Sequence, residues 1–566
     1  MAVPSEFHSE SKGVLICRNG GRGRAIVAPD LPCWQSQVAR ALLICGGAGF
    51  LSAIFGPDNN WDLRFYHLYA PWAYLHGRYL YDIGPAQYQG FFNPTADFLF
   101  YALTSSSLNE TPRIVAFIMG AVHGINAVLI LAIAFHVLRP LQLRERSTLR
   151  AAAWLMGVTG AGFVSLLGTT TNDLINSIFV LGSLLAVLKV AERASKRGAW
   201  LGWAWSGLLA GIGLGLKYTA AVFTPGLGLI AVIAAVRHKT ASGLIAFGAA
   251  AGLGFLGVAG HHLLTLWQDF GNPVFPLLNH IFQSPYYEPQ SIRDTQFLPG
   301  DFLQLIAYPF YWAKTNHHLV SELTFRDWRG AIAYVAIAAG GLTLAARRAC
   351  ETSRRDGVFA ETRGLGLVII FVIVSYFFWE FGFSIYRYAV TLEMLTGVVT
   401  MGALIWLFED RRLRIVVAIV LLTIAVTTTV YLDWGRGEHP SAGIRPGRYG
   451  DRYVDVRVPQ LPVNSVVLIA TRDPVAYFIP FAEPTAQFLG IENNYLELSQ
   501  NNKLASEVRR LMLTPGRPKF ILSVGEFNGN KLNGILEQFG LSLSTLPCQP
   551  IRSNLEEEAL SLCSVR

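Results

Sequence analysis

A carboxylate surrounded by aromatic side chains is the feature of this sequence best suited to chemistry. Asp62 lies just beyond the first long apolar segment, where the chain should leave a membrane. A helix that starts at Asp62 would place Phe65, Tyr66 and Tyr69 on the same face as the carboxylate. A carboxylate held in this way can accept a proton from a hydroxyl group. Asp58 is a second acid of the same stretch, and it is either a rival base or a turn residue.

Asp173 is the second candidate acid. It follows Asn172 at a point where one apolar segment hands over to the next. Two interpretations stay open. Asn172 could cap the following helix, with Asp173 complementing the helix dipole in the first turn. Alternatively, Asp173 faces the same cavity as Asp62 and acts with it.

Two cations lie at the outer ends of apolar segments, where basic residues are rare in membrane proteins. Lys217 and Arg387 either extend to lipid headgroups or bind an anion. Arginine offers a planar fork and lysine a point charge, which together suit the phosphate of a lipid-linked substrate. Tyr386 and Tyr388 flank Arg387 and are expected to fix its guanidinium.

Two further acids lie in or beside apolar runs close to Arg387. Glu380 and Glu393 are of the kind that is usually paired and turned towards the interior of a helix bundle. We therefore expect either of them to pair with Arg387 and to support it structurally.

The composition is that of a multi-pass membrane protein. The chain has 566 residues, of which 52% are hydrophobic and only 15% charged. The formal net charge is +8, but the basic residues cluster in short loops between apolar runs, which argues against nucleic-acid binding. About eleven apolar segments are long enough to span a membrane. They lie near 37–55, 113–138, 151–168, 173–190, 200–216, 219–236, 242–266, 331–346, 365–381, 389–408 and 414–431.

The charge of each loop indicates the side of the membrane on which the loop lies. The basic loops alternate along the chain, and all lie on one side if the N-terminus is cytoplasmic. This predicts a cytoplasmic tail over 1–36, a transmembrane module over 37–431, and the loops 56–112 and 267–330 outside. The predicted location is the inner (plasma) membrane, with the site on its extracytoplasmic face.

The tail over 432–566 has a different character. Strands are expected at 466–470 and 519–523, helices at 503–512 and 531–539, and two short strands after them. This alternation predicts a small α/β domain with a partly parallel sheet, which would cap the site or bind a partner. Cys548 and Cys563 could form a disulfide if the tail is extracytoplasmic. The predicted fold is thus mainly α, a transmembrane helix bundle with a C-terminal extracytoplasmic α/β domain.

With these residues located, the chain resembles the GT-C superfamily of membrane glycosyltransferases, which includes protein mannosyltransferases and aminoarabinose transferases. The likeness covers roughly 38–431. Its motifs are Trp61-Asp62, Tyr66-His67, Gly77-Arg78, Asp82, Pro85-Ala86-Gln87 and Phe92-Asn93-Pro94. The resemblance implies a catalytic acid at Asp62, a second acid at Asp173 and a contact between Arg387 and the carrier phosphate. Many members carry two adjacent acids in the first loop, whereas three residues separate Asp58 from Asp62 here.

These features lead to the hypothesis of a glycosyltransferase that uses a polyprenyl-phosphate-linked hexose or pentose. The acceptor would be an extracytoplasmic glycan, lipid or protein, and the superfamily implies inversion at the anomeric carbon. Asp62 would act as the base, and the substrate contacts would come from Arg387, Lys217, Tyr66, Tyr386, Tyr388 and Asp58. No cofactor and no metal ligand is assigned, and the resemblance leaves the use of a divalent metal open.

The main alternative is a transporter or flippase of lipid-linked saccharides. Such a protein would also need cations at the outer face and acids in the membrane. Transporters usually show related halves and broken helices, and neither is evident in this sequence. A third interpretation, a subunit without catalysis, would leave Asp62 without a purpose.

Overall fold

The computed structural model describes residues 33–139, 141, 143–192, 199–290, 292–314, 319–350, 363–436, 447–555 and 558–566. Nearly all of the predicted cytoplasmic tail over 1–36 therefore lies outside the described residues. The chain divides into two units, 1–40 and 41–566; α1 begins in the first, and the other features below belong to the second.

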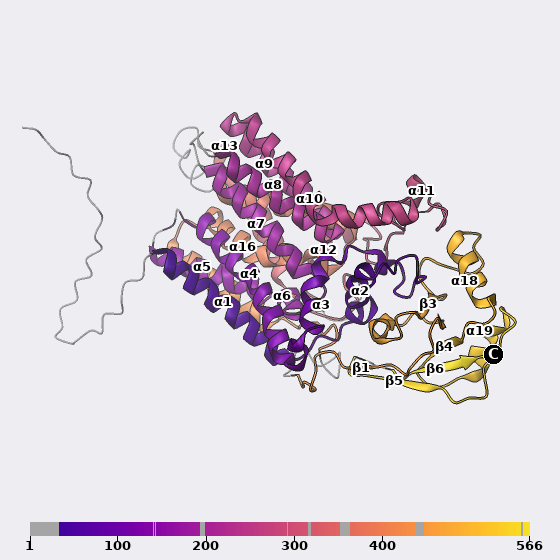
Figure 1. Ribbon diagram of the computed structural model, residues 1–566. Helices are drawn as coiled ribbons and strands as arrows, with labels where there is room; N and C mark the ends of the chain where they lie inside the picture. The colour runs from indigo at the N-terminus through magenta and orange to yellow at the C-terminus, as the bar shows by residue number, and fades with distance from the viewer. Residues whose placement is uncertain are drawn as a thin grey trace, which may run out of the picture. The chain divides into compact units, whose positions relative to one another are not determined.

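The described chain is mainly helical (Figure 1), and it contains a series of mostly apolar helices. They are α1 (Cys33–Phe55), α4 (Pro112–Val137), α5 (Leu143–Val158), α6 (Ala161–Leu166), α7 (Asp173–Glu192), α8 (Ala199–Leu216), α9 (Thr224–His238), α10 (Ala241–Phe270), α13 (Arg329–Cys350), α15 (Arg363–Gly382), α16 (Val390–Leu407) and α17 (Arg411–Thr427). Among the residues described, seven helices are long and apolar enough to cross a membrane, and two shorter apolar helices cover Trp200–Leu216 and Thr224–His238.

The predicted number of about eleven spans is not confirmed. Each predicted segment contains a helix, but some of these helices are short or interrupted. The segment 151–168 is divided because Gly160 has an extended backbone (φ −65°, ψ 152°), which ends one helix and starts α6. Apolar length alone could not reveal this break.

The loop after α1 contains short helices. They are η1 (Leu63–His67), α2 (Tyr69–Leu75), η2 (Tyr88–Phe91), η3 (Pro94–Asp97), α3 (Phe98–Thr104) and η4 (Ser107–Glu110). The helix predicted from Asp62 begins as a π-helical turn, η1, and continues as α2. Pro71 does not stop it, because it lies in the first turn of α2, where backbone N–H groups have no partner within the helix.

The segment between α10 and α13 has two short helices, α11 (Asn279–Phe282) and α12 (Phe302–Tyr311). Two 3-10 helices join apolar helices: η5 (Tyr218–Val222) lies between α8 and α9, and η6 (Tyr386–Ala389) lies between α15 and α16. Beyond α17, the chain forms a six-stranded sheet. Its strands are β1 (Val456–Arg457), β2 (Val466–Ile469), β3 (Gln487–Gly490), β4 (Lys519–Val524), β5 (Gln549–Ser553) and β6 (Leu560–Val565). The sheet is accompanied by η7 (Ala476–Phe481), α18 (Lys503–Leu513) and α19 (Gly529–Glu537).

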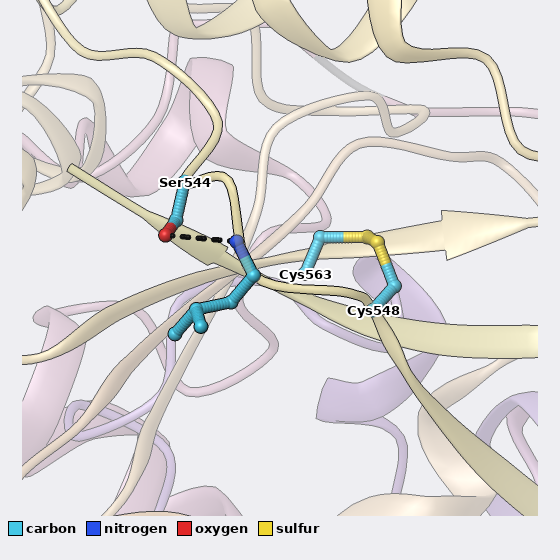
Figure 2. Close-up of a disulfide and its surroundings, with 4 residues drawn as sticks. Ser544, Cys548 and Cys563 are labelled. Carbon is cyan, nitrogen blue, oxygen red and sulfur yellow. Dashed lines mark hydrogen bonds between the residues drawn. A yellow bond between two sulfur atoms is a disulfide. The ribbon is translucent and has the colours of Figure 1, made fainter.

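The strand order is β1-β5-β6-β4-β2-β3. Strands β3, β2 and β4 are parallel, and the other pairs are antiparallel, which confirms the prediction of a partly parallel sheet. Cys548 and Cys563 form a disulfide (Figure 2). In the turn before Cys548, the backbone N–H of Leu546 donates to Ser544 Oγ over 3.3 Å.

The loop after α1 extends this sheet at its β3 edge. Ile83 forms a parallel bridge with Leu489, and its N–H donates to the Phe488 carbonyl over 2.9 Å. The Gly490 N–H in turn donates to the Ile83 carbonyl over 2.7 Å. One hydrophobic core encloses side chains of this loop together with those of the sheet. The loop and the C-terminal region therefore form one packed body, and the edge of β3 is covered.

Arg78 and Asp82 hold this contact together. Arg78 Nε and Nη2 donate to the two carboxylate oxygens of Asp82, over 2.9 and 2.8 Å. The same guanidinium donates to the carbonyls of Pro484 (2.8 Å) and Ala486 (2.6 Å). Asp82 also accepts from the Phe488 N–H over 3.0 Å. These two residues of the sequence motif thus bind the loop to the sheet.

Replacing Arg78 by alanine is expected to lower stability by about 3–5 kcal/mol, because it leaves the buried Asp82 carboxylate without its cation. Thermal unfolding of the purified protein measures the effect as a lower Tm. Arg457→Ala is the matched control, because the Arg457 side chain is 75% exposed and its pair with Asp455 is worth about 0–1 kcal/mol. Equal Tm values for the two variants would contradict this role of Arg78.

Candidate functional site

Asp62 and Arg387 form a direct ion pair. Arg387 Nη1 lies 2.6 Å from Asp62 Oδ2, although 325 positions separate the two residues in the chain. Asp62 stands at the start of η1, and Arg387 lies in η6 at the beginning of the span Tyr386–Leu407. The acid expected to act as a base and the arginine expected to bind phosphate are therefore in direct contact.

Lys217 and Asp173 form a second ion pair. Lys217 Nζ donates to Asp173 Oδ1 and to the Thr171 carbonyl, each over 2.7 Å. Asp173 is the first residue of α7, so its carboxylate complements the helix dipole, as one of the two interpretations expected, and it also pairs with Lys217. Asp173 Oδ2 is buried and has no hydrogen-bond partner among the residues described.

Tyr388 joins the two pairs. The Lys217 Nζ lies 5.1 Å from the centroid of its ring, and the Arg387 Cζ lies 5.3 Å from the same centroid. Both cations therefore lie against one aromatic ring, an arrangement that stabilises them when they are withdrawn from water. Tyr66 is buried and has its ring edge-on to Phe92 at 5.8 Å.

The charges around Asp62 decide its protonation. Burial alone would raise the pKa of Asp62, but Arg387, His67 and Lys217 outweigh burial and lower its pKa below the ordinary value. Asp62 is therefore a carboxylate at neutral pH. The same carboxylate and the burial of the ring raise the pKa of Tyr66, which remains a neutral phenol.

The Asp58 carboxylate is held by hydrogen bonds from neighbouring residues of the protein. Its Oδ2 accepts from the N–H and the hydroxyl of Thr170, over 2.7 and 2.8 Å, and the Asn60 amide donates to both carboxylate oxygens. Its own N–H donates to the Tyr453 hydroxyl over 2.8 Å. Asp58 is fully buried, and these contacts favour the turn role over that of a rival base or a substrate contact.

Tyr386 points away from Arg387. Its hydroxyl donates to the Glu393 carboxylate, and its ring stacks on Phe325 at 4.0 Å. Glu393 accepts from the N–H groups of Gly162 (2.8 Å) and Phe163 (3.0 Å). The expectation that Glu380 or Glu393 pairs with Arg387 is therefore wrong. Arg387 pairs with Asp62, and Glu393 instead caps the start of α6.

A buried charge network lies beneath the site. Arg329 Nη1 donates to Asp327 Oδ2 over 2.8 Å, and its Nη2 donates to the Thr159 carbonyl over 2.7 Å. Asp327 Oδ2 also accepts from the Ala161 N–H at the start of α6. Tyr386 links the network to η6 through Glu393. It therefore links η6 to the start of α6.

Asp327→Ala is expected to destabilise the protein by about 3–5 kcal/mol, because Arg329 is fully buried and would lose its counter-ion. The measurement is again Tm in detergent. Asp451→Ala, at an exposed position, serves as the control and should leave Tm nearly unchanged. A Tm for Asp327→Ala within the range of the control would show that the network does not support the bundle.

His67, Asp97 and Asn172 form a further buried polar group that was not expected from the sequence. His67 Nδ1 lies 2.7 Å from Asp97 Oδ1, and the Asn172 amide donates to the same oxygen. Asp97 is also the acid in the first turn of η3, which Asn93 caps. Asn172 has φ +64°, a left-handed conformation that asparagine tolerates. The Tyr66-His67 motif was the available signal, but nothing in the sequence indicated its partners.

Comparison with known proteins gives the following. No protein-family model and no curated protein matches the chain. Among solved structures, it is similar to ArnT from Cupriavidus metallidurans bound to undecaprenyl phosphate, with a TM-score of 0.47 and 12% identity over 94% of this chain and 97% of that one. It is also similar to ArnT from the same organism in the apo state, with a TM-score of 0.46 and 11% identity over 94% of this chain and 97% of that one.

A third similarity is to the Archaeoglobus fulgidus oligosaccharyltransferase in the apo form, with a TM-score of 0.46 and 12% identity over 88% of this chain and 70% of that one. ArnT and this oligosaccharyltransferase are GT-C glycosyltransferases, the superfamily that the sequence motifs resemble. With TM-scores below 0.5, these similarities assign no activity to this chain. The chain's own geometry defines a multi-pass membrane protein with paired charges beside a helix end.

Proposed function

We propose that this protein is a membrane glycosyltransferase that moves a sugar from a polyprenyl-phosphate carrier to a hydroxyl group of an extracytoplasmic acceptor. The observation that carries the proposal is the 2.6 Å pair of Asp62 and Arg387. A base and an anion-binding cation in contact are what such a transfer needs, because the acceptor loses a proton where the donor releases a phosphate.

The two cations are suited to the donor phosphate. Arg387 Nε is buried without a hydrogen-bond partner in the described chain, so its fork has donor capacity that Asp62 does not use. Lys217 directly follows α8, and the two cations, Lys217 and Arg387, both lie against the Tyr388 ring. Arg387 opens a transmembrane helix, and Lys217 directly follows another apolar helix. A phosphate carried on a lipid tail would reach both from within the bilayer.

The reaction follows from this arrangement. The donor phosphate binds Arg387 and competes with Asp62 for the guanidinium, which increases the proton affinity of the carboxylate. Asp62 accepts the hydroxyl proton as the acceptor oxygen bonds to the anomeric carbon. The bond from that carbon to the phosphate oxygen breaks, and the lipid phosphate leaves on Arg387 and Lys217. A single displacement of this kind inverts the anomeric centre, as the superfamily resemblance implies.

The predicted topology supports a lipid-linked donor. A site on the extracytoplasmic face of the inner membrane has no access to cytosolic nucleotide sugars, so a lipid-linked sugar is the donor that can reach it. Within the described chain, no three or more His, Cys, Asp or Glu side chains are grouped to hold a metal ion. We assign no metal ligands.

Proteoliposomes that contain the purified protein and a polyprenyl phosphate carrying a labelled hexose or pentose test the proposal. A new covalent bond between label and acceptor supports a transferase. Label that crosses the bilayer without a new bond would contradict the proposal and indicate a flippase. Mass analysis of the surface glycans of a deletion strain would then identify the acceptor.

A further inference from the structure

The exposed residues of α12 are all apolar. They are Phe302, Leu303, Ile306 and Phe310, and the Leu303 side chain is 77% exposed. These residues occupy positions i, i+1, i+4 and i+8, so they form a single stripe along the helix. The helix contains no charged residue, although it belongs to the loop 267–330, which is predicted to lie outside the membrane. Such a stripe is unfavourable in water, because apolar surface is driven out of water.

The opposite face of α12 is attached to the protein. Tyr308 lies on this face and is fully buried. Its hydroxyl lies 3.4 Å from the Ser384 carbonyl, and its ring is edge-on to Trp379 of α15 at 5.8 Å. Trp312, which caps the C-terminal end of α12, is edge-on to Tyr386 of η6 at 5.0 Å. The inner face of α12 therefore packs on α15 and η6, and the apolar stripe is directed away from these contacts.

These contacts place α12 at the ends of candidate membrane spans. The span Arg363–Gly382 ends, and the span Tyr386–Leu407 begins, in the region that α12 contacts. A third span, Arg329–Arg347, contains Tyr334, whose ring is edge-on to Phe310 of the stripe at 5.9 Å. Tyr334 is itself 39% exposed. The stripe on α12 is therefore continuous with the outward surface of a transmembrane helix, which contacts lipid.

We propose that α12 lies flat in the outer leaflet of the membrane, with its apolar stripe among the lipid acyl chains. An amphipathic helix in this position is buried about 5–10 Å into the boundary between headgroups and acyl chains. Lipid is the partner that this surface fits, because the stripe joins the lipid-facing side of α13 and offers a partner protein no charged group of α12. The inference goes beyond the proposed function and does not depend on it.

Spin labels on the stripe test this position. The four cysteines outside the disulfide are first replaced by serine; they are Cys17, Cys33, Cys45 and Cys350. One nitroxide is then attached at Leu303→Cys, or at Ile306→Cys, in the full-length protein in phosphatidylcholine vesicles. Its accessibility to oxygen, which concentrates in the bilayer, is compared with its accessibility to a water-soluble nickel chelate. We expect both labels to favour oxygen, at a depth of about 5–10 Å.

Two further positions provide the references. Val335→Cys, 52% exposed in the span Arg329–Arg347, gives the reading of a label in lipid. Glu537→Cys, exposed on α19, gives the reading of a label in water. Readings at 303 and 306 equal to that at 537 would overturn the proposal, because the stripe would then face water. Labels shielded from both reagents would also overturn it and would indicate that a protein covers the stripe.

The two stripe positions are independent tests, because each label lies on an exposed side chain and either variant alone gives a reading. The Tm of each labelled protein is measured first, and a variant that does not fold is replaced by the other. Sugar transfer does not enter the measurement. Failure of the transfer assay would therefore contradict the proposed function alone, and water-like labels would contradict only the placement of α12.

Discussion

Asp62→Asn is expected to lower kcat by about 10²–10⁴-fold, the range that a positioned general base contributes. Asparagine has nearly the same shape and can still accept a hydrogen bond from Arg387, so the local packing should be kept. Its amide cannot take a proton from the acceptor. Transfer of labelled sugar by the purified variant at saturating donor and acceptor is the measurement.

The control for this prediction is Asp294→Asn, an exposed acid of the long loop between α10 and α13, which should keep full activity. The two variants change the net charge equally, so a difference between them belongs to the position of Asp62. Transfer by Asp62→Asn at the wild-type rate would remove Asp62 from the mechanism. Asp58 would not replace it, because Thr170 and Asn60 already engage its carboxylate.

Arg387→Ala is expected to lower kcat/KM for the lipid-linked donor by about 10²–10³-fold, with a much smaller change in KM for the acceptor. The physical reason is that the departing phosphate loses a donor aimed at its growing charge. Initial rates measured while donor and acceptor are varied separately distinguish the two effects. An equal loss on both substrates would speak against a phosphate site.

Arg387→Lys is the companion variant, because Arg387→Ala also leaves Asp62 buried without its partner. Lysine keeps the charge but not the planar fork, so an intermediate loss of donor use is expected. Both variants need a Tm measurement. If donor use falls only in proportion to the folded fraction, the role of Arg387 is structural.

Several parts of the fold could be predicted because they depend on local pattern. The apolar segments predicted the places of the helices, and short apolar runs predicted β2 and β4 at nearly their observed bounds. The change from long apolar segments to alternating short ones predicted the α/β region. Strand β3 was missed because Gln487–Gly490 begins with a polar residue and ends with a glycine, so it lacks the continuous apolar run that marks β2.

The site was predictable in its residue types and not in its pairings. An acid and a cation at helix ends are unusual enough in a membrane protein to be found from sequence, which is how Asp62 and Arg387 were selected. Glu393 was proposed as the partner of Arg387 because it is near in sequence. It lies in the helix that follows η6 and turns to the start of α6 instead.

The sequence by itself determined which segments are apolar enough for a membrane, which loops carry positive charge, and which charged residues stand at helix ends. These are local properties, because each depends on a few consecutive side chains. Only the tertiary structure decided that Asp62 meets Arg387, that Asp97 orients His67, and that Arg78 with Asp82 binds the first loop to β3. Burial explains each of these contacts, because a charged group withdrawn from water is stable only beside a hydrogen-bonding or oppositely charged partner. Which partner lies within reach depends on the fold and not on the neighbouring sequence.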